Sequence, residues 1–200
     1  MGDQTLATET TDADRLNEDF VPHDWENLKE LIGSNNLGLL RRKPQDLERY
    51  LAWSAETKAR YGSVTDFILQ NRLPAHWGQP PFEPESPVPF DRDSDFHVLV
   101  NDWPYGLVPG IAHIVVWSRT PIPVDAGKGD VTPESRALVA AFVRRHFVDP
   151  LGPGGADRVL WFKNWTSLQS VRSLEHIHVL VRDVDDETMQ RWTGHRPQQQ

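Results

Sequence analysis

The stretch HIHVLVRD, residues 176–183, has the alternation of a β-strand. Residues two apart on a strand share a face, so His176 and His178 point to one side and Ile177 and Val179 to the other. Three more segments share this strand character, being rich in Val, Ile and aromatic residues: FHVLVN (96–101), IAHIVVWS (111–118) and RVLWFKN (158–164). These segments predict an antiparallel sheet at the centre of the fold.

Helical signals flank and separate the predicted strands. Apolar residues recur at helical spacing, and Ser63 and Thr132 are suited to cap the helices that follow them. We expect helices over residues 24–33, 44–61, 63–71, 132–147 and 185–192. Strands and helices in this order predict an α+β fold, in which helices pack on one antiparallel sheet behind a helical N-terminal extension.

The helix expected at 44–61 has clear boundaries. Pro44 suits its first turn, and Gly62 suits its C-terminal cap. The pattern places Leu47, Tyr50, Leu51 and Ala55 on one face of this helix.

The chain divides into four parts by composition. Residues 1–20 are acidic with almost no large apolar side chain, which predicts a disordered tail. Residues 21–73 form the helical extension, 74–90 a connector and 91–195 the α+β core. Six prolines within 16 residues of the connector forbid regular structure over most of its length. Extension, connector and core are expected to form a single globular domain, 21–195.

Composition excludes several classes of protein. No apolar stretch approaches the roughly 18 residues that span a bilayer, and the acidic N-terminus is unlike a signal peptide. The chain has no cysteine, which excludes disulfides, thiolate metal sites and cysteine nucleophiles. The net charge of −8 argues against binding nucleic acid except through a local patch. We expect a cytoplasmic protein without membrane contact.

The pair His176 and His178 carries the sharpest chemical signal. An imidazole, with an ordinary pKa of about 6.5, can act as a nucleophile or a general base. A metal site needs at least a third ligand, which His113 on a neighbouring strand would supply. The other alternative is a surface strand with polar residues outward. We expect a catalytic site, without metal or cofactor.

The surrounding segment FKNWTSLQSVRSLEHIHVLV (162–181) resembles the signature of the histidine-triad superfamily. In that signature an Asn and then Gln-Ser-Val precede alternating histidines on a strand. The resemblance implies a histidine-triad-like core, with His178 as the nucleophile on phosphorus and His176 as the first histidine. The chain departs from the signature at Leu180, where the third histidine would stand, and in the spacing around Gln169.

A second resemblance covers almost the whole chain beyond the tail. Its segments are YLAWSAETKARYGSVTDFIL (50–69), VNDWPYGL (100–107), HIVVWSRTPIPVD (113–125), TPESRALV (132–139), VLWFKNWTSLQSV (159–171) and LEHIHVLVRD (174–183). These are similar to the fungal N-acetylglucosamine-induced protein family, a domain of unknown function. We associate such proteins with arginine-containing cyclodipeptide synthases, which join two aminoacyl groups from aminoacyl-tRNA into a diketopiperazine.

That activity needs a pocket for an arginine side chain. A guanidinium prefers a planar carboxylate partner and an aromatic face, which Asp102 beside Trp103 and Tyr105 would offer. The same residues lie in a run of turn formers, so a simple turn is the alternative. The other side chains expected to contact the small-molecule substrate are Asn164, Trp165, Gln169 and His113.

The catalytic groups are expected on and just before the last strand. His178 or His176 would be the base, and Glu175 is a second candidate carboxylate. Ser170 is the candidate nucleophile for an acyl-enzyme, with Ser167 and Thr166 as alternatives. Each hydroxyl would need a neighbouring base within hydrogen-bond reach.

Aminoacyl-tRNA as a partner requires basic side chains. The candidates are Arg41, Arg42, Lys43, Lys163 and Arg172. Solvated helix ends are the alternative explanation for these residues. The competing functions are a histidine-triad-like hydrolase or transferase acting on a nucleotide or nucleotide sugar, and a metabolite-binding regulatory protein without turnover. The second amino acid, the oligomeric state and any direct role of N-acetylglucosamine stay open.

Overall fold

A computed structural model of the chain describes residues 19–194. The acidic tail predicted for residues 1–20 lies almost entirely outside the described residues, as does the last residue of the predicted domain. The Pro-rich connector contains only a short 3₁₀ turn, Ala75–Trp77, and another at its far side, Asp93–Asp95, leads into the first strand. No helix among residues 19–194 is both long and apolar enough to cross a membrane.

The centre of the molecule is one antiparallel sheet, as predicted. Its strands are β1 (Phe96–Val100), β2 (Ile111–Ser118), β3 (Val159–Phe162) and β4 (Glu175–Arg182). They lie in the order β1-β2-β4-β3, with antiparallel pairing throughout. The last strand of the chain is therefore central, so that β4 is covered on both edges and buried on both faces.

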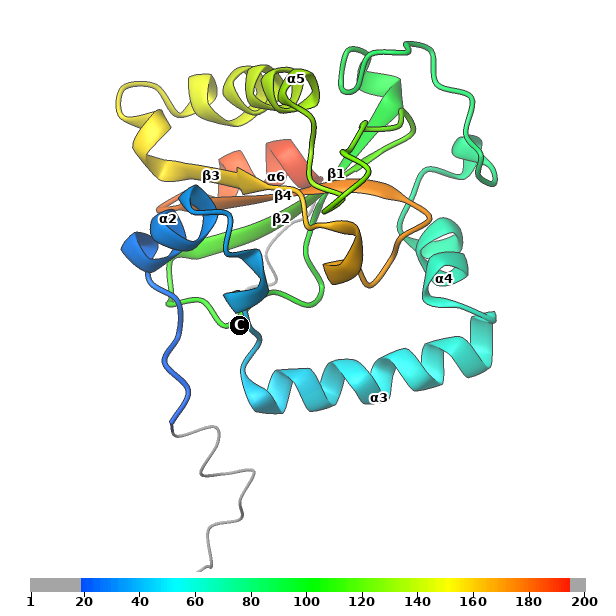
Figure 1. The fold of residues 1–200 in the computed structure, drawn as a ribbon, viewed down its shortest axis with the longest axis horizontal. Coiled ribbons are helices and arrows are strands. Elements are labelled where there is room, and N and C mark those ends of the chain that lie inside the picture. The colour runs from blue at the N-terminus through cyan, green and yellow to red at the C-terminus, as the bar shows by residue number, and fades with distance from the viewer. Residues whose placement is uncertain (1–18, 195–200) are drawn as a thin grey trace, which may run out of the picture.

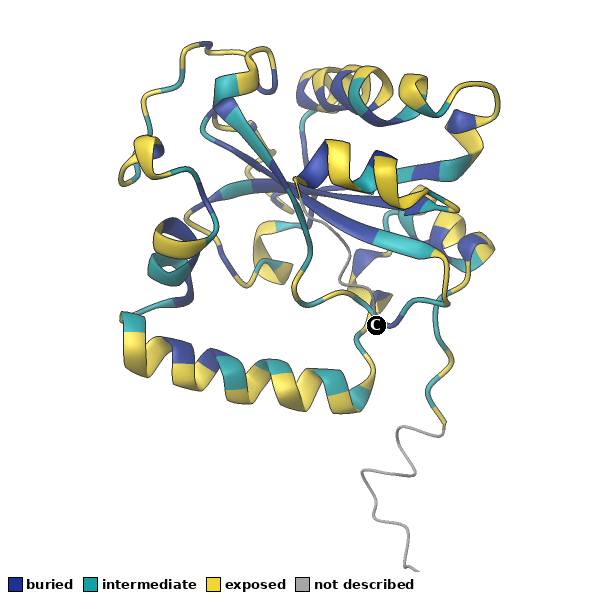
Figure 2. Cartoon of the chain, turned by 180° about the vertical axis from the view of Figure 1, so that it is seen from behind, coloured by how far each residue is buried: buried dark blue, intermediate teal, exposed yellow. Residues whose placement is uncertain are grey.

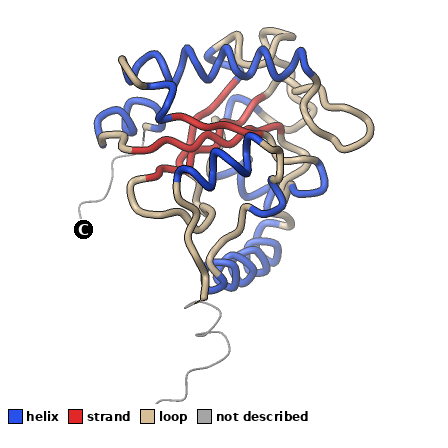
Figure 3. Tube along the Cα trace, turned by 60° about the vertical axis from the view of Figure 1, so that its left-hand side comes forward, coloured by secondary structure: helices blue, strands red, loops and turns tan. Residues whose placement is uncertain are grey.

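Five α-helices surround the sheet in the described part of the chain. They are α2 (Trp25–Gly33), α3 (Pro44–Tyr61), α4 (Val64–Asn71), α5 (Pro133–Val143) and α6 (Asp186–Thr193). A single π-helical turn, Arg144–Val148, continues α5, close to the end predicted for this helix. Figure 1 shows α5 on one side of the sheet and α3 and α4 on the other. Figure 3 shows the sheet between these helices, so the α+β prediction is confirmed.

Local side chains begin these helices. Asp24 accepts a hydrogen bond from the Asn27 backbone N–H at the start of α2, and Ser63 accepts one from Asp66 at the start of α4. Thr132 caps α5 in the same way. Each such cap stabilises a helix by about 1 kcal/mol. The helix starts predicted from Ser63 and Thr132 are confirmed.

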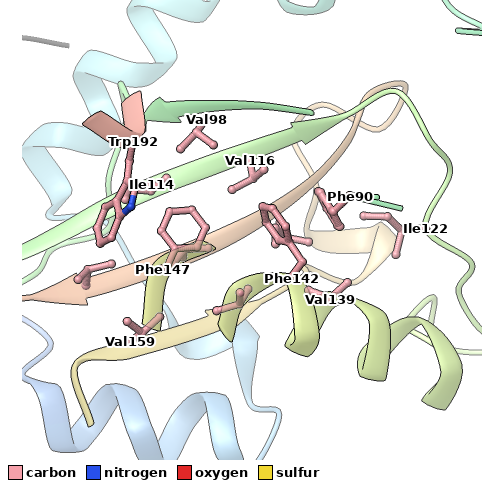
Figure 4. Close-up of a cluster of buried hydrophobic side chains, with 14 of the residues drawn as sticks. Phe90, Val98, Ile114, Val116, Ile122, Val139, Phe142, Phe147, Val159 and Trp192 are labelled. Carbon is pink, nitrogen blue, oxygen red and sulfur yellow. The ribbon is translucent and has the colours of Figure 1, made fainter. Parts of the chain in front are cut away.

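One face of the sheet carries the larger apolar core (Figure 4). Ile177, Val179 and Val181 of β4 point into it and are inaccessible to solvent. Phe142 of α5 stacks on Phe90 with ring centroids 4.4 Å apart. Burying a side chain of this size stabilises the fold by about 1.5–3 kcal/mol, so this face anchors α5 to the sheet.

The opposite face is divided between two smaller clusters. Leu28 of α2 packs with Leu180 of β4, while Leu69 of α4 packs with Val115 and Trp117 of β2. The alternation of β4 places His176 and His178 on this same face. The two apolar clusters therefore flank a polar strip in the middle of the sheet.

Of the residues predicted on the inward face of helix α3, Tyr50 lies there, but Leu47, Leu51 and Ala55 do not. Leu47 and Leu51 are exposed, by 43% and 57%, and the buried residues of the helix are Ser54 and Thr57. Figure 2 shows how much of α3 is exposed to solvent. The reason is that the inward side of α3 carries the rings of Tyr50 and Trp53, which pack on the rings of Trp103 and Phe67 rather than on an aliphatic core.

Candidate active site

A cavity of about 90 Å³ lies between the helices α3 and α4 and the histidine-bearing face of the sheet. Side chains of β2 and β4 form its floor, with His176 and His178 among them. The loop after β1 and the segment around Ser170 close its sides. A cavity that holds a single water molecule needs only about 10–15 Å³, so this one has room for a small ligand group.

The walls of the cavity are aromatic. The ring centroids of Trp53 and Trp103 are 5.3 Å apart, and Tyr50 lies 5.5 Å from Trp103. Phe67 of α4 packs edge-on against Trp53 at 5.4 Å. Such walls suit a planar or apolar group. Trp103, one of the expected substrate contacts, is among the residues that line the cavity.

Two buried histidines form a hydrogen-bonded pair beneath the cavity. Nε2 of His113 on β2 lies 3.0 Å from Nδ1 of His178 on β4. The other nitrogen of His178, Nε2, lies 3.3 Å from Nδ2 of Asn164. The ring of Phe162 stacks on His178 with centroids 4.9 Å apart. Both nitrogens of His178 are thus engaged, and its ring is held in one orientation.

A second layer of contacts holds this pair in place. Tyr105 stacks on His113 with centroids 5.2 Å apart, and its backbone N–H donates to His113 Nδ1 at 3.4 Å. Asn164 donates to the Tyr105 hydroxyl at 3.2 Å, and Gln169 donates to the Asn164 carbonyl at 2.8 Å. Tyr105, Asn164, Gln169 and His113 therefore lie together, but as supports of His178 rather than as walls of the cavity.

His176 differs from its neighbour because one of its nitrogens has no partner. Its Nδ1 lies 2.8 Å from the carbonyl oxygen of Leu174, which accepts the ring proton. Within the described chain Nε2 makes no hydrogen bond. Trp117 packs on the ring with centroids 4.7 Å apart. The arrangement leaves an unprotonated imidazole nitrogen on a ring that lines the cavity.

All three imidazoles are neutral near pH 7. Burial, together with the positive charge of Arg42, lowers the pKa of His113 to about 3. Burial lowers the pKa of His176 to about 4, against the hydrogen bond to Leu174, which raises it. Burial also lowers the pKa of His178 well below its ordinary value, and the neighbouring histidines add to this effect. Neutral imidazoles can accept protons and act as nucleophiles.

The predicted carboxylate Asp102 lies at the cavity with a cation beside it. Nη2 of Arg72, at the end of α4, donates to Asp102 Oδ1 at 2.8 Å. Both side chains are partly exposed. A substrate guanidinium would share or compete for this carboxylate.

Glu175 and Lys163 lie away from the cavity. Glu175 follows the alternation of β4 and lies on the same face as Ile177, opposite to His176. Its Oε2 forms an ion pair with Nζ of Lys163 at 3.3 Å, and the lysine side chain is only 4% exposed. Neither residue lines the cavity.

The remaining candidates separate into cavity and surface residues. Ser170 is exposed and lines the cavity, while Thr166 and Ser167 belong to a short exposed turn. Trp165 donates to Asn35 at 3.1 Å and carries Lys128 over its ring, away from the cavity. Among the basic candidates, Arg42 lines the cavity, whereas those on the surface are Arg41, Lys43 and Arg172. Residues 19–194 contain no group of three His, Asp or Glu side chains able to hold a metal ion.

Residues 24–182 match the model of a protein family described as a protein of unknown function, DUF3605. The chain belongs to this family. It is 33% identical over 183 residues to N-acetylglucosamine-induced protein 1 of Candida albicans, covering 82% of this chain and 70% of that protein. It is 32% identical over 158 residues to the uncharacterised protein YPL067C of Saccharomyces cerevisiae, covering 78% of this chain and 77% of that protein. The expected likeness to the fungal N-acetylglucosamine-induced proteins is therefore confirmed.

A solved structure of similar fold supports the architecture of this DUF3605 chain. The crystal structure of HTC1 aligns with a TM-score of 0.63 at 29% identity, over 82% of this chain and 87% of that chain. The cavity walls from α3 and α4 are the part of the site that sequence reasoning missed. Tyr50 and Trp53 stand three residues apart on a helix, and this aromatic spacing was the available signal.

Proposed function

We propose that this DUF3605 protein is an aminoacyl-transfer enzyme that forms an arginine-containing cyclodipeptide from aminoacyl-tRNA in the cytoplasm. The observation that carries the proposal is the unprotonated Nε2 of His176 on an aromatic-walled cavity. The choice of substrate rests on the association made above between such proteins and the arginine-containing cyclodipeptide synthases. The hydrogen bonds favour His176 as the reactive base and His178 as the neighbour that completes the cavity floor.

The proposed reaction consists of two successive aminoacyl transfers. The amine nitrogen of one aminoacyl group attacks the ester carbonyl carbon of the other, so that a C–N bond forms and the C–O bond to the ribose breaks. His176 Nε2 accepts the amine proton, and the departing ribose oxygen takes it up. A second attack of the same kind closes the diketopiperazine ring.

The cavity offers a place for each part of this substrate. An arginyl guanidinium would stack on Trp53 or Trp103 and pair with Asp102 in competition with Arg72. Ser170, on the cavity wall, is the candidate for an acyl-enzyme route. Its hydroxyl would displace the ribose oxygen from one aminoacyl ester before the first amine attack, and the seryl oxygen would then be the leaving group in that attack. Glu175 takes no part in the proposed step, because it lies on the other face of β4.

The test is mass spectrometry of lysate and medium from a host that expresses the full chain. We expect a new cyclic dipeptide containing arginine, absent with His176→Gln and with His178→Gln, and present with the control His76→Gln. His76 is exposed and does not line the cavity. Thermal midpoints of the purified variants show whether each is folded. Undiminished product from folded His176→Gln would remove the base assignment.

A second candidate function rests on the contact between Asn164 and His178. Their 3.3 Å approach is the part of the histidine-triad resemblance that has a direct counterpart in side-chain contacts. A nucleotide or nucleotide-sugar hydrolase or transferase would use it. Turnover of adenosine phosphoramidate or a dinucleotide by the purified protein, lost with His178→Gln, would favour this reading. Binding without turnover in either assay would favour a regulatory protein.

A further inference from the structure

Arg42 presents a planar donor group at the wall of the cavity. Its Nε donates to the backbone carbonyl of Trp103 at 3.1 Å. Its guanidinium lies 4.5 Å from the centroid of the Tyr50 ring and 5.8 Å from that of Tyr105. The group is therefore fixed at its root by one hydrogen bond and on its face by an aromatic ring. Because the guanidinium is already held in one orientation, a ligand can bind it without first ordering a flexible side chain. Such ordering would otherwise weaken binding.

The far side of this guanidinium is unused. No Asp or Glu among residues 19–194 forms an ion pair with Arg42, and its Nη1 and Nη2 make no hydrogen bond there. This differs from Arg72, which is neutralised by Asp102 across the same cavity. Because the histidines are neutral, Arg42 leaves the cavity lining with a net positive charge.

A second donor at the cavity also lacks a partner. Nε of Arg72 is buried and makes no hydrogen bond with any described residue. A buried N–H that lacks an acceptor lowers the stability of the fold, so a ligand that supplies the acceptor binds more tightly. The two arginines come from opposite ends of the α3–α4 segment, and both line the cavity.

We propose that Arg42 is the receptor for an anionic oxygen group, a phosphate or a carboxylate, carried by a planar ligand that stacks on the Trp53 and Trp103 wall. The free guanidinium edge matches two oxygens of such a group at once. This proposal rests on the proposed function, because it names the part of the substrate that is held beside His176. A nucleotide phosphate next to an aminoacyl ester would be one source of this group.

An anion bound at Arg42 would also change the pKa of two of the buried histidines. The charge of Arg42 lowers the pKa of both His113 and His178. Lys163 also lowers the pKa of His178, as a smaller contribution than Arg42. An anion bound to Arg42 offsets its charge, so His113 and His178 become stronger bases when the ligand is present.

The test is isothermal titration calorimetry of the full chain with AMP, adenosine, inorganic phosphate and benzoate. We expect AMP or benzoate to bind, with the difference between them identifying phosphate or carboxylate as the recognised group. Adenosine lacks the anion and should bind more weakly than AMP. Arg42→Gln should weaken binding by about 10- to 100-fold. The control Arg49→Gln makes the same charge change on an exposed side chain of α3, and should stay within about twofold of wild type.

The outcomes are separable from those of the cyclodipeptide assay. Arg42→Lys keeps the charge and loses the planar edge, so an intermediate loss supports recognition by the guanidinium. Thermal midpoints establish that each variant is folded. The proposal is overturned if neither AMP nor benzoate binds wild type at about 10 mM, or if Arg42→Gln and Arg49→Gln bind equally. Product formation without anion binding would remove this proposal and leave the proposed function standing.

Discussion

Nε2 of His113 lies 3.0 Å from Nδ1 of His178, and both side chains are buried. The two residues are 65 positions apart in the chain and meet because β2 and β4 are neighbours in the sheet. One proton is shared between these two nitrogens, so the tautomer of either ring dictates that of the other. A group that reacts beside this pair is therefore sensitive to both histidines.

Replacing His113 by Asn should lower both product formation and stability. His178 then loses a buried partner, which costs about 1–3 kcal/mol of unfolding free energy. We expect product in the mass-spectrometric assay to fall about tenfold or more. Urea unfolding and product yield are measured together, with His76→Asn as the control. Full product yield from a folded but destabilised His113→Asn would show that His113 is structural only.

Stability should fall as the solution is made acidic. The folded-state pKa of His176 is about 4 and that of His113 about 3, both below the ordinary value of about 6.5. The unfolded chain therefore binds protons first as pH falls. The contribution of these neutral rings is complete above about pH 6.5 and declines below it, by about 1.4 kcal/mol per pH unit for each histidine.

Urea midpoints measured from pH 7.5 down to pH 5 check this dependence. His176→Gln removes one of the titrating rings and should flatten the profile. A profile of the same slope in wild type and His176→Gln would mean that other groups control acid stability.

The two sides of α3 should respond differently to truncation. Trp53→Ala removes a cavity wall together with its contacts to Trp103 and Phe67, so ligand binding should weaken by about tenfold. Leu51→Ala alters the exposed side of the same helix and should change stability by less than about 0.5 kcal/mol. Calorimetric titration with AMP and thermal unfolding distinguish the two. Equal effects of Trp53→Ala and Leu51→Ala would place the ligand elsewhere.

The ion pair between Lys163 and Glu175 should matter for stability and not for turnover. Glu175→Gln leaves the buried ammonium of Lys163 without its carboxylate, at a cost of about 2 kcal/mol, moderated because Glu175 is partly exposed. The double variant Lys163→Met with Glu175→Leu should recover most of this stability. Product yield from the double variant decides the role of Glu175. A folded double variant that makes no product would return Glu175 to the catalytic groups.

The elements of this fold follow from local patterns. Alternation predicted the strand at 176–183, and capping residues such as Ser63 and Thr132 predicted where helices begin. These signals involve residues only a few positions apart, so they can be recognised in the sequence alone. The face of α3 was, for the same reason, predicted wrongly except at Tyr50. The local pattern grouped Leu47 with Leu51, while the partner that decides the buried side is Trp103, distant in sequence.

The strands, the helix starts and the shared face of His176 and His178 can be predicted from the sequence alone, because period and capping are properties of neighbouring residues. The Leu174 carbonyl that binds His176 Nδ1 is only two residues away and is a local contact. Which of the two rings keeps a free nitrogen depends on contacts between segments, because His113 and Asn164 reach His178 from other parts of the chain. The cavity walls on α3 and α4 and the unpaired guanidinium of Arg42 arise in the same way. They depend on distances between segments that no local pattern encodes.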